Sequence, residues 1–237
     1  YQPDLLYTDG ALPFGEVGRT MLAHYYNSNR ARHGGSLEAV YCLKDPRKPQ
    51  GGDSEYVEGI GVQDVERGGL AEIKPQPWQT DTSIGDWFYN KNWEAKDTGT
   101  MYRSPAWVIR NLVDIVSKNG NMLLNVIQRP DGSLDPEVEQ LLSEMADWMK
   151  VSGEAIFETR PWEVFGEGEA KVEAGHFKED FNFTARDIRF TRSKDGKTLY
   201  AIALGLPDGD VRIQSLAKGK WPITAVQLLG GGEKLSW

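Results

Sequence analysis

A carboxylate follows directly on a short apolar run near the start of the chain. Residues 5–7 read Leu-Leu-Tyr, and the chain continues through Thr8 into Asp9 and Gly10. An apolar run without alternation is typical of a parallel strand that is covered on both faces. An acid at the carboxyl end of such a strand does not serve the packing, and in a (β/α) barrel this end carries the chemistry. Asp9 is therefore the first candidate catalytic residue. The alternative is a rim aspartate that caps the next helix or pairs with Arg19.

The chain also contains eight tryptophans. Indole rings stack on the apolar faces of sugars, although most tryptophans in folded proteins are simply core residues. The count favours a carbohydrate site, but only weakly.

Helical and strand patterns alternate over the first two thirds of the chain. Three helices are predicted, at residues 16–31, 104–120 and 135–153. Ser104 and Asp135 are the expected N-caps of the second and third helices, because each directly precedes a proline. Short apolar runs predict further strands at residues 37–43 and 122–127. Residues 62–68 and 78–83 resemble two short strand ends separated by an irregular connection, and a long loop is expected over residues 44–61.

The pattern changes near residue 156. Short alternating segments predict an antiparallel sheet, with strands at residues 187–191, 199–204, 211–214 and 223–229. The predicted fold class is α/β: residues 1–158 form the second half of a (β/α) TIM-like barrel, and residues 159–237 begin a β-sandwich. We expect this fold to be incomplete at both ends.

Composition excludes several classes of function. The formal net charge of −8 argues against a nucleic-acid-binding surface, which needs a basic stripe. The sequence has no apolar run as long as a membrane span. Cys42 is the single cysteine, so no internal disulfide can form, and no Cys/His set has zinc spacing.

Four motifs, in the same order along the chain, resemble segments of the α-L-fucosidases of glycoside hydrolase family 29. They are Pro3-Asp-Leu-Leu-Tyr-Thr-Asp-Gly10, Trp78-Gln-Thr-Asp-Thr-Ser-Ile-Gly-Asp-Trp-Phe-Tyr-Asn90, Gly120-Asn-Met-Leu-Leu-Asn-Val126 with Pro130-Asp-Gly132, and Gly153-Glu-Ala-Ile156 with Arg160-Pro-Trp162. The first is similar to the family's nucleophile segment, the second to its Trp-Glu/Gln motif, the third to its Gly-Asn strand and the fourth to its exit from the barrel. The resemblance covers residues 1 to about 165.

The resemblance implies a retaining exo-α-L-fucosidase that needs no metal or organic cofactor. Retention requires one carboxylate as nucleophile and a second as general acid and then base. Asp9 is the implied nucleophile. Glu66 is the implied acid/base, because Asp64-Val-Glu-Arg-Gly68 leaves a short strand for a loop over the site. Glu72, Glu58 and Glu55 are its rivals, and a solvated Glu66 paired with Arg67 is the alternative.

The resemblance also implies a sugar-binding role for Trp78, Trp87 and Arg67, with Trp78 as a wall of the pocket or, alternatively, a core residue. Gln79 stands where many family members have Glu, so no catalytic role is assigned to it. Phe88 replaces a small residue of the family's Trp-Gly-Tyr and is expected to narrow a neighbouring subsite.

The family's fucose-binding histidines lie on strands that precede the nucleophile strand, and no residue here matches them. We therefore expect a companion chain or a missing N-terminal segment to complete the barrel. The family favours a periplasmic or secreted location, although the chain shows no signal peptide. Two other functions stay open: a non-catalytic carbohydrate-binding or assembly fragment, and a retaining glycosidase for another sugar.

Overall fold

Five parallel strands form the first sheet of the protein. The computed structural model describes residues 1–44, 57–232 and 235–237. The strands are β1 (Leu5–Thr8), β2 (Val40–Lys44), β3 (Val62–Asp64), β4 (Trp78–Ser83) and β5 (Gly120–Asn125), and they lie in this order across the sheet. Each pairs in parallel with its neighbour, which confirms the parallel strands predicted from the apolar runs near residues 5–7 and 122–127. The carboxyl ends of all five strands therefore lie along one edge of the sheet.

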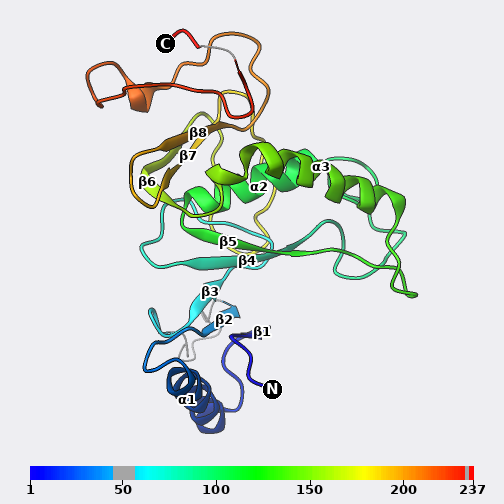
Figure 1. The fold of residues 1–237 in the computed structure, drawn as a ribbon. Helices are drawn as coiled ribbons and strands as arrows, with labels where there is room; N and C mark the ends of the chain where they lie inside the picture. Colours follow the sequence, from blue (N-terminus) through cyan, green and yellow to red (C-terminus); the bar gives the residue numbers. More distant parts are fainter. Residues whose placement is uncertain (45–56, 233–234) are drawn as a thin grey trace.

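Three helices connect or follow these strands (Figure 1). They are α1 (Gly15–Arg32), α2 (Pro105–Ser117) and α3 (Pro136–Ser152). On one face of α1, Leu22, Tyr25 and Tyr26 pack against Tyr41 and Leu43 of β2. The helix predicted at residues 16–31 is thus confirmed. None of the helices in the described part of the chain is long and apolar enough to cross a membrane.

The two predicted N-caps behave differently. The hydroxyl oxygen of Ser104 accepts a hydrogen bond from the amide of Trp107, which satisfies a free N–H in the first turn of α2. Asp135 stands at the N-cap of α3, but its side chain makes no capping bond. Its carboxylate instead accepts the hydroxyl of Tyr102 at 2.6 Å and pairs with Arg129. Cap position was predictable, whereas the use of the Asp135 carboxylate depended on which side chains packed nearby.

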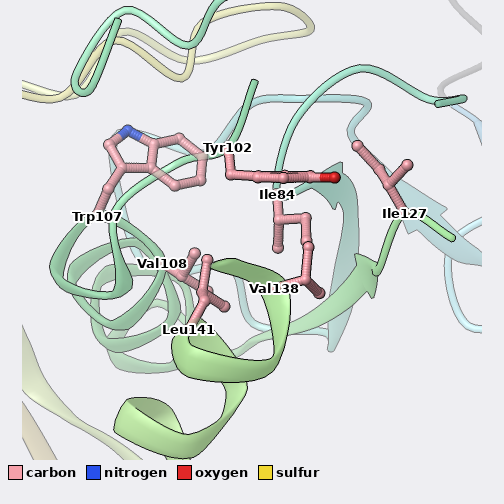
Figure 2. Packing of buried hydrophobic residues seen from close by; sticks show 7 residues of the cluster. All are labelled: Ile84, Tyr102, Trp107, Val108, Ile127, Val138 and Leu141. Carbon is pink, nitrogen blue, oxygen red and sulfur yellow. The ribbon is translucent and has the colours of Figure 1, made fainter. Parts of the chain in front are cut away.

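The main core lies between strands β4 and β5 of the parallel sheet and the helices α2 and α3. Figure 2 shows its seven buried members converging from strand ends, loops and both helices: Ile84, Tyr102, Trp107, Val108, Ile127, Val138 and Leu141. Burying a side chain of this size contributes about 1.5–3 kcal/mol. The cluster fixes α2 and α3 against β4 and β5, which carry part of the candidate site.

A separate antiparallel sheet follows the helices. Its strands are β6 (Thr159–Glu167), β7 (Ile188–Ser193) and β8 (Leu199–Ala203), in the order β6-β7-β8. The sequence predicted β7 and β8 but not β6. The strands predicted at 211–214 and 223–229 are wrong, because the described structure has no ladder at either segment. The amides of Gln214 and Ser215 donate instead to the carboxylate of Glu167 and open a short 3₁₀ turn (Gln214–Leu216). The described residues after α3 thus form one antiparallel sheet, and the prediction that residues 159–237 begin a β-sandwich stays a prediction.

Helix α2 lies between the two sheets (Figure 1). Its face away from the parallel sheet carries Val113, which packs with Ile156, Phe183 and Leu204 in a second buried cluster. On the same helix the buried carboxylate of Asp114 accepts hydrogen bonds from Lys118 at 2.7 Å and from Arg189 of β7 at 2.6 Å. Apolar packing and a buried ion cluster therefore join the antiparallel sheet to the rest of the fold.

Close packing between Trp78 and Gly120 aligns β4 with β5. Trp78 is 0% exposed, packs with Val65 and Ile115, and donates from its indole nitrogen to the carbonyl of Lys118 at 2.9 Å. A Cβ added to Gly120 would lie 2.6 Å from both the Trp78 ring and the Ile115 side chain. The glycine of the Gly-Asn motif is thus required by the neighbouring indole.

We expect Gly120→Ala to lower the free energy of unfolding by about 1–3 kcal/mol, because the added methyl group overpacks the Trp78 contact. Urea denaturation followed by tryptophan fluorescence measures this change. Gly209→Ala is the matched control: no atom lies within 4 Å of its added Cβ, and we expect a change within about 0.5 kcal/mol. Equal stabilities for the two variants would contradict the packing argument.

Candidate active site

A single ammonium group joins three carboxylates at the carboxyl edge of the parallel sheet. Lys44, the last residue of β2, lies 3.1 Å from Asp9, 2.8 Å from Glu66 and 2.9 Å from Asp81, measured from Nζ to the nearest carboxylate oxygen. Asp9 follows β1, Glu66 lies just beyond β3, and Asp81 belongs to β4. Parallel pairing brings the four strands together, and each of these residues lies in or just after the carboxyl-terminal half of its strand.

The contacts to Lys44 limit the separation of the two predicted catalytic carboxylates. Since the nearest oxygens of Asp9 and Glu66 both touch Nζ, they are at most the sum of the two contacts apart, about 6 Å. Retaining glycosidases hold their two carboxyl groups about 5–5.5 Å apart. The side chain of Asp9 is 79% exposed, whereas that of Glu66 is 20% exposed. Asp9 and Glu66 thus face the same ammonium group, one as an open and one as a sheltered carboxylate.

A buried acid pair lies beneath this group. Asp64 is 0% exposed and neighbours Asp81, whose Oδ1 is buried without a hydrogen-bond partner among the described residues. Burial and the nearby charge of Asp81 raise the pKa of Asp64 to about 8, although the Gln79 amide and Lys44 act in the opposite direction. Asp64 is therefore protonated at neutral pH, and its proton can supply the partner that Asp81 lacks.

Two neutral side chains form hydrogen bonds with the buried carboxyl groups of Asp64 and Asp81. The Gln79 amide donates to Asp64 at 2.9 Å, and the Tyr7 hydroxyl lies 3.3 Å from Asp64 and 3.2 Å from Asp81. Burial and the surrounding carboxylates raise the pKa of Tyr7, so its hydroxyl stays protonated and donates. For Lys44, burial opposes the charge, but hydrogen bonds to Glu66, Asp81 and Asp9 outweigh it and raise the pKa of the ammonium. Lys44 is thus a permanent cation at the centre of the site.

The guanidinium of Arg67 forms hydrogen bonds inside the protein. Its guanidinium donates to Glu179 at 2.9 Å and to the carbonyl of Gly85 at 2.5 Å, and it lies 4.5 Å from the centre of the Trp87 ring. The side chain is 11% exposed. Both terminal nitrogens of the guanidinium thus have a protein partner, and the sugar-binding role of Arg67 stays a prediction. Glu66 pairs with Lys44, and not with Arg67 as the alternative interpretation had it.

Trp87 forms an aromatic surface beside the charged group. Its half-buried ring lies over Arg67 and 5.8 Å from the ammonium of Lys44. The Asn125 amide, at the end of β5, donates to the carbonyl of Trp87 at 3.1 Å and holds its loop against the sheet. Phe88, the residue that replaces a small family residue, is 82% exposed. Trp87 is therefore the predicted sugar-contact residue that lies at the site.

Trp78 has a different place. It is fully buried against Val65 and Ile115, on the side of the sheet that faces α2. This burial contradicts the prediction that Trp78 forms a wall of the sugar pocket. The indole belongs to the core, because the apolar side chains of α2 cover it completely.

Two other candidates for the acid/base role, Glu58 and Glu72, lie away from Asp9. Glu58 is exposed and forms a bridge with Gly61, just before β3 begins. Glu72 is exposed and lies within electrostatic range of Lys118, which precedes the start of β5. Both therefore lie toward the amino-terminal edge of the sheet, away from Asp9. Glu55 lies outside the described residues.

Sequence reasoning missed Lys44 and Asp81. Lys44 directly follows the apolar run 37–43, just as Asp9 closely follows the first run, but it was assigned to the loop. Asp81 lies in the middle of the segment Trp78–Ser83, which was interpreted as a strand end. A charge directly after an apolar run was the signal available for Lys44, whereas the polar neighbours of Asp81 gave no such signal.

Comparisons with known proteins agree on one family. A family model described as Alpha-L-fucosidase matches residues 1–154. The plasma alpha-L-fucosidases of Pongo abelii and Homo sapiens are 28% and 27% identical over 242 aligned residues; each alignment covers 100% of this chain and 46% of the relative. A crystal structure of Thermotoga maritima alpha-fucosidase in complex with fucose superposes with a TM-score of 0.61 at 26% identity, covering 88% of this chain and 40% of that one. The chain spans about half the length of the curated relatives it matches.

The raised pKa of Asp64 predicts that the free energy of unfolding depends on pH. Between about pH 4 and pH 8 the folded protein holds a proton on Asp64 that the unfolded chain releases, so this group's stabilisation is lost as the pH rises through that range. Asp64→Asn cannot ionise. We therefore expect its free energy of unfolding, relative to the unmodified protein, to increase with pH by up to about 1.4 kcal/mol per unit.

Urea titrations at several pH values between 4.5 and 8.5 measure this difference. Asp131→Asn is the control, because Asp131 is exposed, its pKa is lowered chiefly by a hydrogen bond from Ser133, and its contribution changes only at more acidic pH. A constant difference between Asp64→Asn and the unmodified protein would show that Asp64 is ionised throughout.

Proposed function

The chain belongs to the alpha-L-fucosidase family, whose model matches residues 1–154, and on this premise we propose that it carries the catalytic carboxylates of a retaining exo-α-L-fucosidase. The observation that supports this proposal is the shared contact of Asp9 and Glu66 with Lys44, which keeps the two carboxylates at most about 6 Å apart. The substrate class follows from the relatives, which are named alpha-L-fucosidases, and from the solved neighbour in complex with fucose.

In the first step Asp9 attacks the anomeric carbon of a terminal α-L-fucoside. As the glycosidic bond breaks, Glu66 gives its proton to the departing oxygen, and a fucosyl ester forms on Asp9 with inverted configuration. The exposed position of Asp9 suits a nucleophile that must reach the sugar. The sheltered position of Glu66 suits a group whose proton must be kept for the leaving oxygen.

In the second step Glu66, now ionised, takes a proton from water. The resulting hydroxide attacks the anomeric carbon, the ester bond to Asp9 breaks, and fucose leaves with its original configuration. Two inversions thus give net retention. The one proton that Glu66 lost in the first step returns to it in the second.

Lys44 keeps the carboxylates in place between turnovers. A sugar bound between Asp9 and Glu66 would replace the contacts that Lys44 makes with both. The contact with Asp81, whose side chain is 12% exposed, would then hold the ammonium at the floor of the site. In this proposal Trp87 provides the aromatic face beside the sugar, next to Lys44.

We also propose that a further segment or a companion chain completes the parallel sheet. Within the described residues, β1 pairs with β2 and β5 pairs with β4, so each outer strand has one hydrogen-bonded neighbour. Leu5 on β1 is 56% exposed and Leu123 on β5 is 48% exposed. A strand beside β1 would also shelter Asp9, which is otherwise open to solvent.

A mechanism-based label tests the nucleophile. The complete natural polypeptide that carries this chain is incubated with 2-deoxy-2-fluoro-L-fucosyl fluoride, and the adduct is mapped by peptide mass spectrometry. We expect one fucosyl ester on Asp9, because fluoride leaves readily while the 2-fluoro group slows the second step.

Asp9→Asn should abolish the label and lower turnover by more than about 10³-fold. Asp4→Asn, an exposed aspartate just ahead of the same strand, should label normally. If no adduct forms and fucosides bind without turnover, the carbohydrate-binding alternative replaces the proposal. If the label of another sugar is trapped instead, the substrate class is wrong.

The acid/base assignment predicts a dependence on the leaving group. Glu66→Gln should reduce kcat/KM about 10²–10⁴-fold for fucosyl disaccharides, whose leaving oxygen needs a proton. Dinitrophenyl fucoside should be affected far less, and added azide should give α-L-fucosyl azide. Glu72→Gln is the matched control and should leave both substrates unaffected. If Glu72→Gln, and not Glu66→Gln, shows this difference between the two substrates, the acid/base is Glu72 and not Glu66.

A further inference from the structure

A segment from the second half of the chain crosses back to the candidate site. Residues 174–179, which we call the strap, belong to the connection between β6 and β7. The amide of Gly175 donates to the carbonyl of Gly69 at 3.0 Å, and bridges join Gly69 to Ala174 and Gly175. The strap therefore lies directly on the loop that follows β3, which is the loop that carries Glu66.

Glycine at position 68 allows this close approach. A Cβ added to Gly68 would lie 1.9 Å from the carbonyl oxygen of Gly175, which no side chain can tolerate. The Glu-Arg-Gly sequence that identified Glu66 thus has a second physical reason: the residue after Arg67 must admit the strap backbone.

Both backbone polar groups of Glu66 are held by the strap. The amide of Glu66 donates to Nδ1 of His176 at 3.0 Å, and the amide of Phe177 donates to the carbonyl of Glu66 at 2.8 Å. Since the Glu66 amide is the donor, Nδ1 of His176 must be the unprotonated ring nitrogen. Glu66 lies beyond the last ladder residue of β3, so these two bonds replace the pairing that a strand would have provided.

The strap also anchors the residue after Glu66. Its buried Glu179 accepts from Arg67 at 2.9 Å, from Thr82 of β4 at 2.7 Å and from Arg103 at 3.0 Å. Arg67 has a φ of 44°, in the left-handed region, which directs its side chain inward while Glu66 stays at the rim. The strap therefore holds the backbone of Glu66 and the side chain of Arg67, while the backbone amide of Arg67 donates to the carbonyl of Asp81 on β4 at 2.8 Å.

We propose that the strap is part of the active site and that His176 is a positioning residue, whose Nδ1 holds the backbone of Glu66 so that its carboxyl reaches the departing oxygen. This inference rests on the proposed function, and it goes further by assigning a role in proton transfer to a segment beyond the residues that the family model matches. A small displacement of a catalytic group is costly, because proton transfer requires hydrogen-bond distance to the leaving oxygen.

The test compares substrates whose leaving groups differ in their need for a proton. In the complete natural polypeptide, His176→Phe keeps a ring but lacks the acceptor, and His176→Asn keeps an acceptor at a similar position. We expect His176→Phe to lower kcat/KM about 10–100-fold for a fucosyl disaccharide and less than about twofold for dinitrophenyl fucoside. His176→Asn should restore disaccharide hydrolysis to within about threefold of the unmodified protein.

Two further variants provide a control and a replacement for His176→Phe. Arg186→Ala changes a side chain of the same β6–β7 connection, outside the strap, that pairs with Glu169 at the surface, and both substrates should be unaffected. His176→Ala replaces His176→Phe if the larger ring prevents folding, which thermal unfolding reports. Equal losses on both substrates, or no loss on either, would overturn the role of His176 while leaving the proposed function intact. No turnover of any fucoside by the unmodified protein would overturn both.

Discussion

The charge of Lys44 is the constraint on which the site depends. Three carboxylates meet at one edge of the sheet, and without a cation their mutual repulsion and desolvation would oppose the fold. Lys44 meets all three at 2.8–3.1 Å, from the end of the strand that pairs with β1 and β3. The parallel sheet thereby gathers opposite charges from strands far apart in sequence. The same contacts keep the carboxylates of Asp9 and Glu66 at most about 6 Å apart.

The second constraint is the coupling between the two sheets. Helix α2 packs on both, through the cluster in Figure 2 on one side and through Val113 on the other. The buried contact between Asp114 and Arg189 fixes β7 in the same unit. This attachment lets the connection between β6 and β7 return to the carboxyl edge and hold Glu66. The antiparallel sheet thus helps to hold Glu66 in the candidate site.

Local rules explain which elements could be predicted. Ser104 caps α2 as its position before a proline indicated, and the continuous apolar runs became parallel strands. Asp135 kept its position but gave its carboxylate to Tyr102, because a buried hydroxyl competed for it. The strand predicted at 211–214 failed because Glu167, 47 residues from Gln214, takes the amides that a ladder would have used. Both of these departures involve a partner distant in sequence.

The sequence by itself determined the family, the order of the βα units, and Asp9 as the acid at a strand end, because these depend on local pattern and on motifs in order. Tertiary structure alone decided that Trp78 is core, that Arg67 is held by Glu179, and that Lys44 joins Asp9 to Glu66. The physical reason is that burial and charge pairing depend on which side chains meet across strands. Local pattern specifies the end of a strand, but only the packed sheet specifies its neighbours.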